Sequence, residues 1–129
     1  MAVNEAVAGQ VAARYVVVFG GGAFRIDPSS GPNDRHIQDI HAPGLIRGPN
    51  VLFFRTHHHN GRPTLRVRFG ASQQPLIQYT FPDMVPVDWQ TIIPAGMLLT
   101  QNNELIFSIS GDGFIDIGDI FILYTCQIN

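Results

Sequence analysis

Short apolar runs separated by Gly, Pro, Asn and Asp recur along the whole chain, and no stretch carries a long helical repeat. Runs of β-branched and aromatic residues between turn-forming residues are typical of β-strands. Gly20 to Gly22 is expected to separate the first two strands, and residues 1–14 to form a loose or partly helical arm. The pattern predicts strands at 15–19, 23–27, 36–40, 51–57, 63–69, 76–81, 89–93, 104–110, 114–117 and 120–125.

About eight to ten short strands joined by turns predict an all-β fold, an antiparallel jelly-roll β-sandwich that forms a single domain over residues 1–129. Two segments within it resemble each other, "PGLIRGPNVLFFR" (43–55) and "AGMLLTQNNELIFS" (95–108). Each runs from a Gly through apolar residues and a polar turn ending in Asn into an apolar strand. We expect the apolar residues to plug the open end of the sandwich, and the aligned Asn50 and Asn103 to satisfy backbone groups in the turns.

Composition narrows the class of protein. The 129 residues are 45% hydrophobic and only 14% charged, which excludes disorder. A formal net charge of −2 argues against nucleic-acid binding driven by positive charge. Cys126 is the single cysteine, so no disulfide can form within the chain. No signal peptide is evident and the apolar runs are too short to span a membrane, so we expect a soluble protein, cytoplasmic or exported by a non-classical route.

The stretch "RTHHHNGRP" (55–63) contains the strongest turn signal. Asn60-Gly61 is typical of a two-residue β-hairpin turn, which would pair strand 51–57 directly with strand 63–69. Because side chains alternate across a strand, Leu52, Phe54, Thr56, Leu65, Val67 and Phe69 would face the core. The opposite face would carry Arg55, His57, His59, Arg62, Thr64, Arg66 and Arg68, with Phe53 among them. His58 would point the other way.

Three interpretations of the histidines remain open: a metal site, a solvated hairpin tip, and a face that binds a ligand or partner. His57 and His59 could supply two zinc ligands, but a site needs a third, for which His36, His41 and Asp83 are the candidates. The arginines on the same predicted face repel one another unless acids, a ligand or a partner chain lies among them. Pairing with Asp residues of neighbouring strands, binding of sugar hydroxyls or anions, and burial in an oligomer interface would each relieve the repulsion.

Other polar residues offer weaker candidates. Asp112, Asp116 and Asp119 in "GDGFIDIGD" could supply oxygen ligands to calcium, although a turn at Gly111-Asp112-Gly113 explains the first of them. Trp89 could stack on a sugar ring or pack in the core, and its neighbours Asp88 and Gln90 could hydrogen-bond to a sugar.

One family resemblance follows from these segments. The stretch "WQTIIPAGMLLTQNNELIFSISGDGFIDIGDIFILY" (89–124) resembles the C-terminal half of galactose-binding-like jelly-roll domains and carbohydrate-binding modules. The segment 42–69 is similar to the "GxNVLxxR" and "LxVxF" strands of the same domains. The resemblance implies a carbohydrate-binding domain, and Asp119 matches an acidic residue of the final strand, which makes it the calcium candidate. The N-terminal third lacks the acidic pair that holds calcium in many such modules.

No catalytic motif is present: the chain has no Gly-x-Ser-x-Gly elbow, phosphate-binding loop, dinucleotide fingerprint or His-Glu-x-x-His. We therefore expect a non-catalytic, lectin-like domain that binds carbohydrate, without nucleic-acid or membrane partners. Its predicted binding residues are Arg55, His57, His59, Arg62, Arg66, Arg68, Asp88 and Trp89. The alternatives are an assembly protein whose Arg-rich face is buried in a homo-oligomer, and a small metal-dependent enzyme using His57 and His59.

Overall fold

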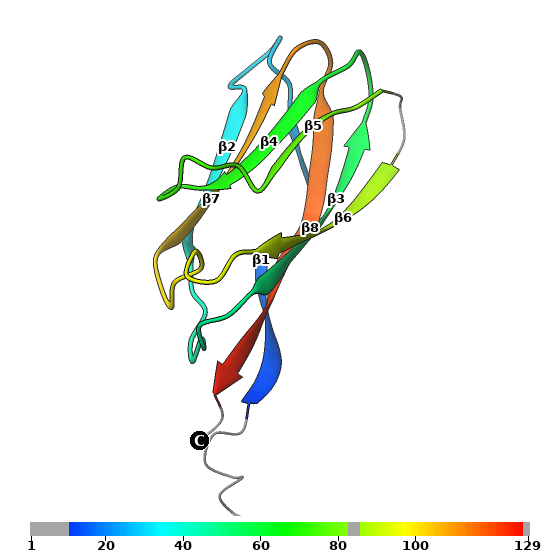
Figure 1. Ribbon diagram of the computed structural model, residues 1–129. Coiled ribbons are helices and arrows are strands. Elements are labelled where there is room, and N and C mark those ends of the chain that lie inside the picture. The colour runs from blue at the N-terminus through cyan, green and yellow to red at the C-terminus, as the bar shows by residue number, and fades with distance from the viewer. Residues whose placement is uncertain (1–10, 83–85, 128–129) are drawn as a thin grey trace, which may run out of the picture.

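The computed structural model describes residues 11–82 and 86–127, which form two four-stranded antiparallel sheets packed into a sandwich (Figure 1). The first sheet has the strand order β1-β8-β3-β6 and the second has the order β2-β7-β4-β5. The predicted all-β antiparallel sandwich is therefore confirmed. In chain order, the strands are β1 (Val11–Ile26), β2 (Asp34–Ile40), β3 (Asn50–His58), β4 (Thr64–Phe69), β5 (Ile77–Thr80), β6 (Pro86–Ile93), β7 (Asn103–Ser110) and β8 (Ile115–Gln127).

The expected break at Gly20 to Gly22 was wrong, because β1 continues through these residues. The pairing of β1 with β8 shifts register between Val17 and Phe19 and again between Phe19 and Ala23, so the glycines form an irregularity inside one strand. The expected arm over 1–14 was wrong for residues 11–14, which belong to β1, and its first ten residues lie outside the described part. The two strands predicted at 114–117 and 120–125 are both part of β8.

Alternating apolar residues build the core between the sheets. In β3, Leu52, Phe54 and Thr56 are buried while Arg55 and His57 are exposed, as the sequence predicted. In β4, Leu65, Val67 and Phe69 are buried. The core is completed by inward residues of the other strands, among them Ile26, Ile93, Leu105, Phe107, Ile109, Ile117, Ile120 and Ile122.

The chain near Asn60-Gly61 does not form the expected hairpin. Strand β3 pairs with β6 and β8 in the first sheet, whereas β4 pairs with β5 and β7 in the second. The two-residue hairpin turn needs a positive φ at both central residues; Gly61 has one, at 67°, but Asn60 does not. The connection crosses from one sheet to the other instead of folding back, so the predicted pairing of strand 51–57 with strand 63–69 is wrong. Arg55 lies opposite Asp88 and Phe53 lies opposite Gln90, both in β6.

The two repeated loops are joined by a hydrogen bond from the N–H of Ala42 to the carbonyl of Thr100, and of their apolar residues Leu98 is buried whereas Leu99 is exposed. Asn103 is buried; its side-chain amide donates to the carbonyls of Ile40 and Leu99, and its oxygen accepts from the N–H of Leu99 at 2.8 Å. Asn50 is also buried and its amide donates to the carbonyl of Gly48. The prediction that both Asn residues satisfy backbone groups is confirmed.

Candidate functional site

The outward face of the first sheet carries an unusual amount of apolar surface. Strand β1 is an edge strand and β6 is the opposite edge. Tyr15, Val17 and Ile92 on these strands are 66%, 69% and 65% exposed. Large apolar side chains gathered on one surface mark a binding or interaction site more often than isolated ones do. This face is therefore the first place to look for a function.

An aromatic ridge lies at the centre of this face. Phe53 of β3 and Phe121 of β8 are directly paired, and their rings stack with centroids 4.8 Å apart and planes 11° apart. Tyr15 of β1 meets Phe121 edge to face, with centroids 5.4 Å apart. The ridge thus takes one aromatic residue from each of three adjacent strands, and both Phe side chains are half-buried.

A charged cluster adjoins the ridge. The guanidinium of Arg55 donates from Nε to Asp88 Oδ1 at 2.9 Å, and its Nη1 lies 3.8 Å from Asp119 Oδ2. The three side chains are 66%, 73% and 55% exposed, so their ion pairs contribute little to stability and their polar atoms remain accessible to a ligand. This pairing of Arg55 with an Asp of a neighbouring strand was one of the explanations that the sequence left open.

A β-bulge aims Asp119 at this cluster. Phe53 pairs with Phe121 and Arg55 pairs with Gly118, so β8 has one more residue than β3 across this interval. Asp119 lies in this bulge and has a positive φ of 52°. Bulges commonly redirect a side chain at a functional surface. The same bulge brings Gly118 against β1, where a Cβ on Gly118 would approach the carbonyl oxygen of Gly22 within 2.5 Å.

Two adjoining hollows run along this face, with volumes of about 580 and 410 Å³. Both are lined by Arg55, Asp88 and Asp119, so they form one continuous groove with the charged cluster at its middle. The aromatic ridge lines one end, and Gly21 and Gly22 line the other. Nothing lies within 4 Å of the position that a Cβ would take on either glycine, so side chains there would extend into open space beside the groove. We call this feature the first-sheet groove.

The histidines lie beside the end of the groove that Gly21 and Gly22 line. His57 and His59 share the outward face, with ring centroids 4.3 Å apart, and His58 is buried, as alternation predicted. His59 Nε2 lies 2.7 Å from Asp116 Oδ2. Arg25 donates two hydrogen bonds to the same carboxylate. These bonds are the main cause that lowers the pKa of Asp116.

Not every predicted binding residue reaches the groove. Arg55, His57 and Asp88 line it, and His59 lies beside it. Arg66 and Arg68 belong to the second sheet, and Arg62 lies in the connection between the sheets, so the single Arg-rich face was a wrong prediction. Trp89 is among the residues that line the groove, but its ring packs against the core: its indole N–H donates to Thr56 Oγ1 at 3.0 Å and the ring stacks on Phe54. That arrangement is the core packing that the sequence left open.

Gln90, which the sequence offered as a residue that could hydrogen-bond a sugar, lies opposite Phe53 and lines the groove. Sequence reasoning missed Phe121, which lines the groove, and Tyr15, which contacts Phe121. The alternation of Asp119, Phe121 and Leu123 along the last strand could have indicated that these side chains share one face of the sheet. It could not have shown that Phe121 lies beside Phe53.

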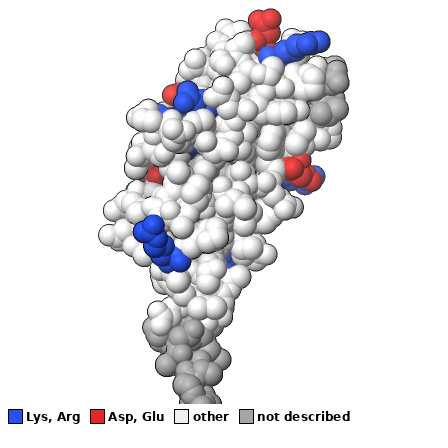
Figure 2. All heavy atoms as spheres, in the orientation of Figure 1, with Lys and Arg blue, Asp and Glu red and all other residues white. Residues whose placement is uncertain are grey.

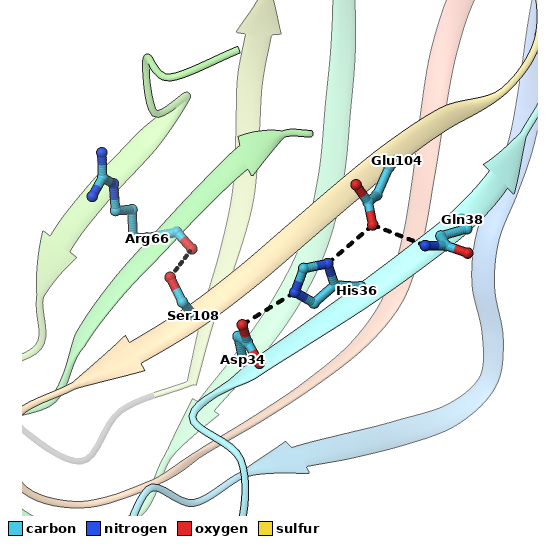
Figure 3. A network of polar contacts seen from close by, with 6 residues as sticks. All are labelled: Asp34, His36, Gln38, Arg66, Glu104 and Ser108. Atoms are coloured by element: carbon cyan, nitrogen blue, oxygen red, sulfur yellow. Dashed lines mark hydrogen bonds and ion pairs between the residues drawn. The ribbon is translucent and has the colours of Figure 1, made fainter. Parts of the chain in front are cut away.

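The outward face of the second sheet has a different chemistry (Figure 3). His36 lies between two carboxylates, with Nδ1 3.0 Å from Glu104 Oε2 and Nε2 3.1 Å from Asp34 Oδ2. These contacts raise the pKa of His36, and the hydrogen bond to Glu104 is the largest cause. His36 in turn lowers the pKa of Glu104. Gln38 also donates to Glu104, and the Ser108 hydroxyl donates weakly to the Arg66 carbonyl. This face is an ordinary hydrogen-bonded, solvated sheet surface.

The metal predictions receive no support from the described residues. Within residues 11–82 and 86–127, no group of three or more His, Cys, Asp and Glu side chains could hold a metal ion. His36 is held by its own carboxylates and His41 accepts the N–H of Asn102, so neither joins His57 and His59. Asp83, the remaining candidate for a zinc site, lies outside the described residues. Asp119, the calcium candidate, has Arg55 as its charge partner.

On the side shown in Figure 2, charged side chains form a few small groups, several of them with both signs of charge, and uncharged surface lies between the groups. Within the described part of the chain, no helix is long and apolar enough to cross a membrane.

The fold has clear structural relatives, although no family model and no curated protein matches the sequence. The chain aligns with dimeric latent PorU from Porphyromonas gingivalis at a TM-score of 0.61 and 9% identity, over 93% of this chain and 13% of that one. It aligns with the CBM36-1 domain of a multidomain xylanase from the hindgut metagenome of Trinervitermes trinervoides at a TM-score of 0.52 and 11% identity, over 91% of this chain and 100% of that one.

A mutant of CBM29-2, a family 29 carbohydrate-binding module, aligns at a TM-score of 0.53 and 16% identity, over 88% of this chain and 92% of that one. The chain therefore has the β-sandwich fold of carbohydrate-binding modules. The fold class that the sequence resemblance implied is confirmed. Because identities this low show the fold alone, ligand binding has to be argued from the groove itself.

Proposed function

We propose that this chain is a non-catalytic carbohydrate-binding domain and that the first-sheet groove is its sugar site. The observation that carries the proposal is the stack of Phe53 on Phe121 next to the Arg55–Asp88 pair. Aromatic side chains offer apolar surface to the C–H face of a sugar ring. A guanidinium and carboxylates offer donors and acceptors to its hydroxyls. The groove has both within one continuous hollow.

Two further features support this proposal. The charges in the groove are accessible, and Arg55 pairs with both Asp88 and Asp119, so a neutral ligand can exchange hydrogen bonds with them without leaving a buried charge unpaired. The fold is shared with proteins whose names describe carbohydrate-binding modules. Catalysis is not part of the proposal, because no side chain in the groove combines a nucleophile with a placed general base.

A glycan array tests this function, with wild type compared with Phe121→Ala and Arg66→Ala. We expect binding to a set of neutral oligosaccharides that Phe121→Ala weakens and that Arg66→Ala leaves unchanged, because Arg66 lies on the other sheet. Wild-type protein that binds nothing across a broad array would remove the proposal. Equal loss in both variants would place the site elsewhere.

Assembly with a second copy is the other candidate function, favoured by the exposure of Tyr15, Val17 and Ile92. The Arg-rich face that first suggested assembly does not exist as one surface, so only the apolar strands of the first sheet support it now. Light scattering over a range of protein concentrations distinguishes the two functions. A discrete oligomer that Val17→Asp dissociates would favour assembly, and a monomer at all concentrations would exclude it.

A further inference from the structure

A second hollow, of about 660 Å³, lies between the two repeated loops and away from the first-sheet groove. Its lining comes from the stretches 45–50 and 96–102. Leu98 is buried at the base, Leu45 is half-buried and Leu99 is exposed. Gln101 and Asn102 contribute polar side chains and Arg47 contributes the only charge among its lining residues. The volume lies in the range of small-molecule sites.

Backbone and side-chain hydrogen bonds hold both walls in place. The N–H of Ala42 donates to the carbonyl of Thr100 at 2.9 Å, which ties the first loop to the second. Asn103 fixes both the N–H and the carbonyl of Leu99. The N–H of Ile46 donates to the carbonyl of Thr125 of β8 at 3.0 Å. The hollow is thus formed before any ligand arrives, which lowers the entropic cost of binding.

Arg47 is placed over the backbone of the opposite loop. A Cβ on Gly96 would come within 3.4 Å of Arg47 Nη2, so the guanidinium lies against the glycine, whose φ is 87°. A side chain at this position would crowd the Arg47 guanidinium, and residues other than glycine rarely adopt such a positive φ. Across residues 11–82 and 86–127, Arg47 has no hydrogen-bond or ion-pair partner, whereas Arg25 and Arg55 each have a carboxylate. Its donors are therefore available to a ligand.

The charge of this hollow is opposite to that of the groove. The groove is lined by Asp88, Asp116 and Asp119, and the hollow is lined by no acidic residue at all. A guanidinium forms paired hydrogen bonds with a planar carboxylate, and leucine side chains favour an apolar group beside it. The hollow is therefore suited to a ligand that the groove would repel.

We propose that the hollow between the two repeated loops binds a carboxylate carried by a partly apolar molecule. Arg47 receives the carboxylate in a bidentate pair. Leu98 and Leu99 contact the apolar part, and the amides of Gln101 and Asn102 lie at the rim, where they can bond to polar substituents. This site is independent of the proposed sugar site, and either can fail without the other.

Backbone amide NMR of the full chain tests the proposal with matched probes. Benzoate should shift the signals of residues 45–50 and 96–102, while benzamide, the neutral analogue of the same shape, and inorganic phosphate should leave them unchanged. Arg47→Gln should weaken benzoate binding roughly tenfold or more, because it removes a charge-assisted pair. Arg62→Gln, at another exposed arginine far from the hollow, is the control and should bind as wild type does.

Three results would overturn the proposal. Equal shifts with benzamide would mean that Arg47 does not recognise the charge, and equal shifts with phosphate would mean that the leucines contribute nothing. Benzoate binding that survives in Arg47→Gln would also refute it. Because Arg47 is exposed, its replacement is not expected to unfold the chain, and an unchanged melting temperature of the variant would check this.

Discussion

Phe53 and Phe121 stack face to face across the β3–β8 pair, with ring centroids 4.8 Å apart. They come from opposite halves of the chain, and the packing of the core does not require them, because both side chains point away from it. The pair therefore offers aromatic surface on the outside of the sheet. With the adjacent Arg55–Asp88 pair, it suits a ligand that has both apolar and hydroxyl surface.

Removing one ring of the pair is expected to weaken sugar binding. Phe121→Ala removes aromatic contact with the ligand and the support that Phe53 and Tyr15 receive from it, so we predict about a tenfold loss of affinity. Isothermal titration with an oligosaccharide selected on the array measures it. Arg66→Ala changes an exposed residue of the second sheet and should bind as wild type does. Affinity that drops equally in both variants would contradict a site on the first sheet.

Chelation is expected to leave sugar binding unchanged. Asp88 and Asp119 already have Arg55 as a counter-charge, so these groove carboxylates do not require a cation. Titrations with and without EDTA should give the same affinity. Arg55→Gln, in contrast, leaves the two carboxylates without their shared partner and removes a donor, and should lower the affinity roughly tenfold. Binding restored to EDTA-treated protein only by calcium would contradict this account and would revive Asp119 as a metal ligand.

The two aligned asparagines are expected to contribute unequally to stability. Asn103 makes three hydrogen bonds at 2.8–2.9 Å, whereas Asn50 makes bonds of 3.1 and 3.4 Å. Asn103→Ala leaves backbone groups of Ile40 and Leu99 without partners, so we predict a loss of about 3 kcal/mol in the free energy of unfolding, and a smaller loss for Asn50→Ala. Urea denaturation of both variants provides the comparison. Equal losses would show that the hydrogen bonds do not determine the difference.

His36 is expected to make stability fall as the pH rises above the ordinary histidine pKa of 6.5. The hydrogen bond to Glu104 is the main cause that raises the pKa of His36 above 6.5 in the folded protein. The protonated side chain therefore stabilises the fold fully at a pH below the pKa of His36 in the unfolded chain. This stabilisation is lost as the pH rises through the pKa of His36 in the folded protein. Because the pair is largely exposed, the change in melting temperature should be about a few degrees or less. Glu104→Gln should reduce this pH dependence. A variant that retained the full wild-type dependence would exclude the His36–Glu104 pair as its cause.

Local patterns predicted much of the fold. Alternation in Leu52, Phe54 and Arg55 correctly sorted one strand into an inner and an outer face, because side-chain direction depends only on the strand itself. The turns held by Asn50 and Asn103 were also predictable, because an Asn side chain bonds to nearby backbone wherever it begins such a strand.

The pairing of strands could not be predicted in the same way. Asn60-Gly61 specifies a positive φ, and Gly61 adopts it, but a tight turn does not determine whether the next strand returns to the same sheet or crosses to the other. In this sandwich the chain crosses, so Arg66 lies on a different surface from Arg55. The groove depends on contacts between distant segments, such as Phe53 with Phe121, which carry no local signature.

The most direct test of the sugar site is a backbone amide NMR titration with an oligosaccharide that the array identifies. We predict that the shifted signals cluster on the outward residues of β3, β6 and β8, around Phe53, Asp88 and Phe121, and that signals of the second sheet around Arg66 stay in place. Shifts that instead cluster on the second sheet, or at the loop end around Arg47, would contradict the assignment of the groove as the carbohydrate site.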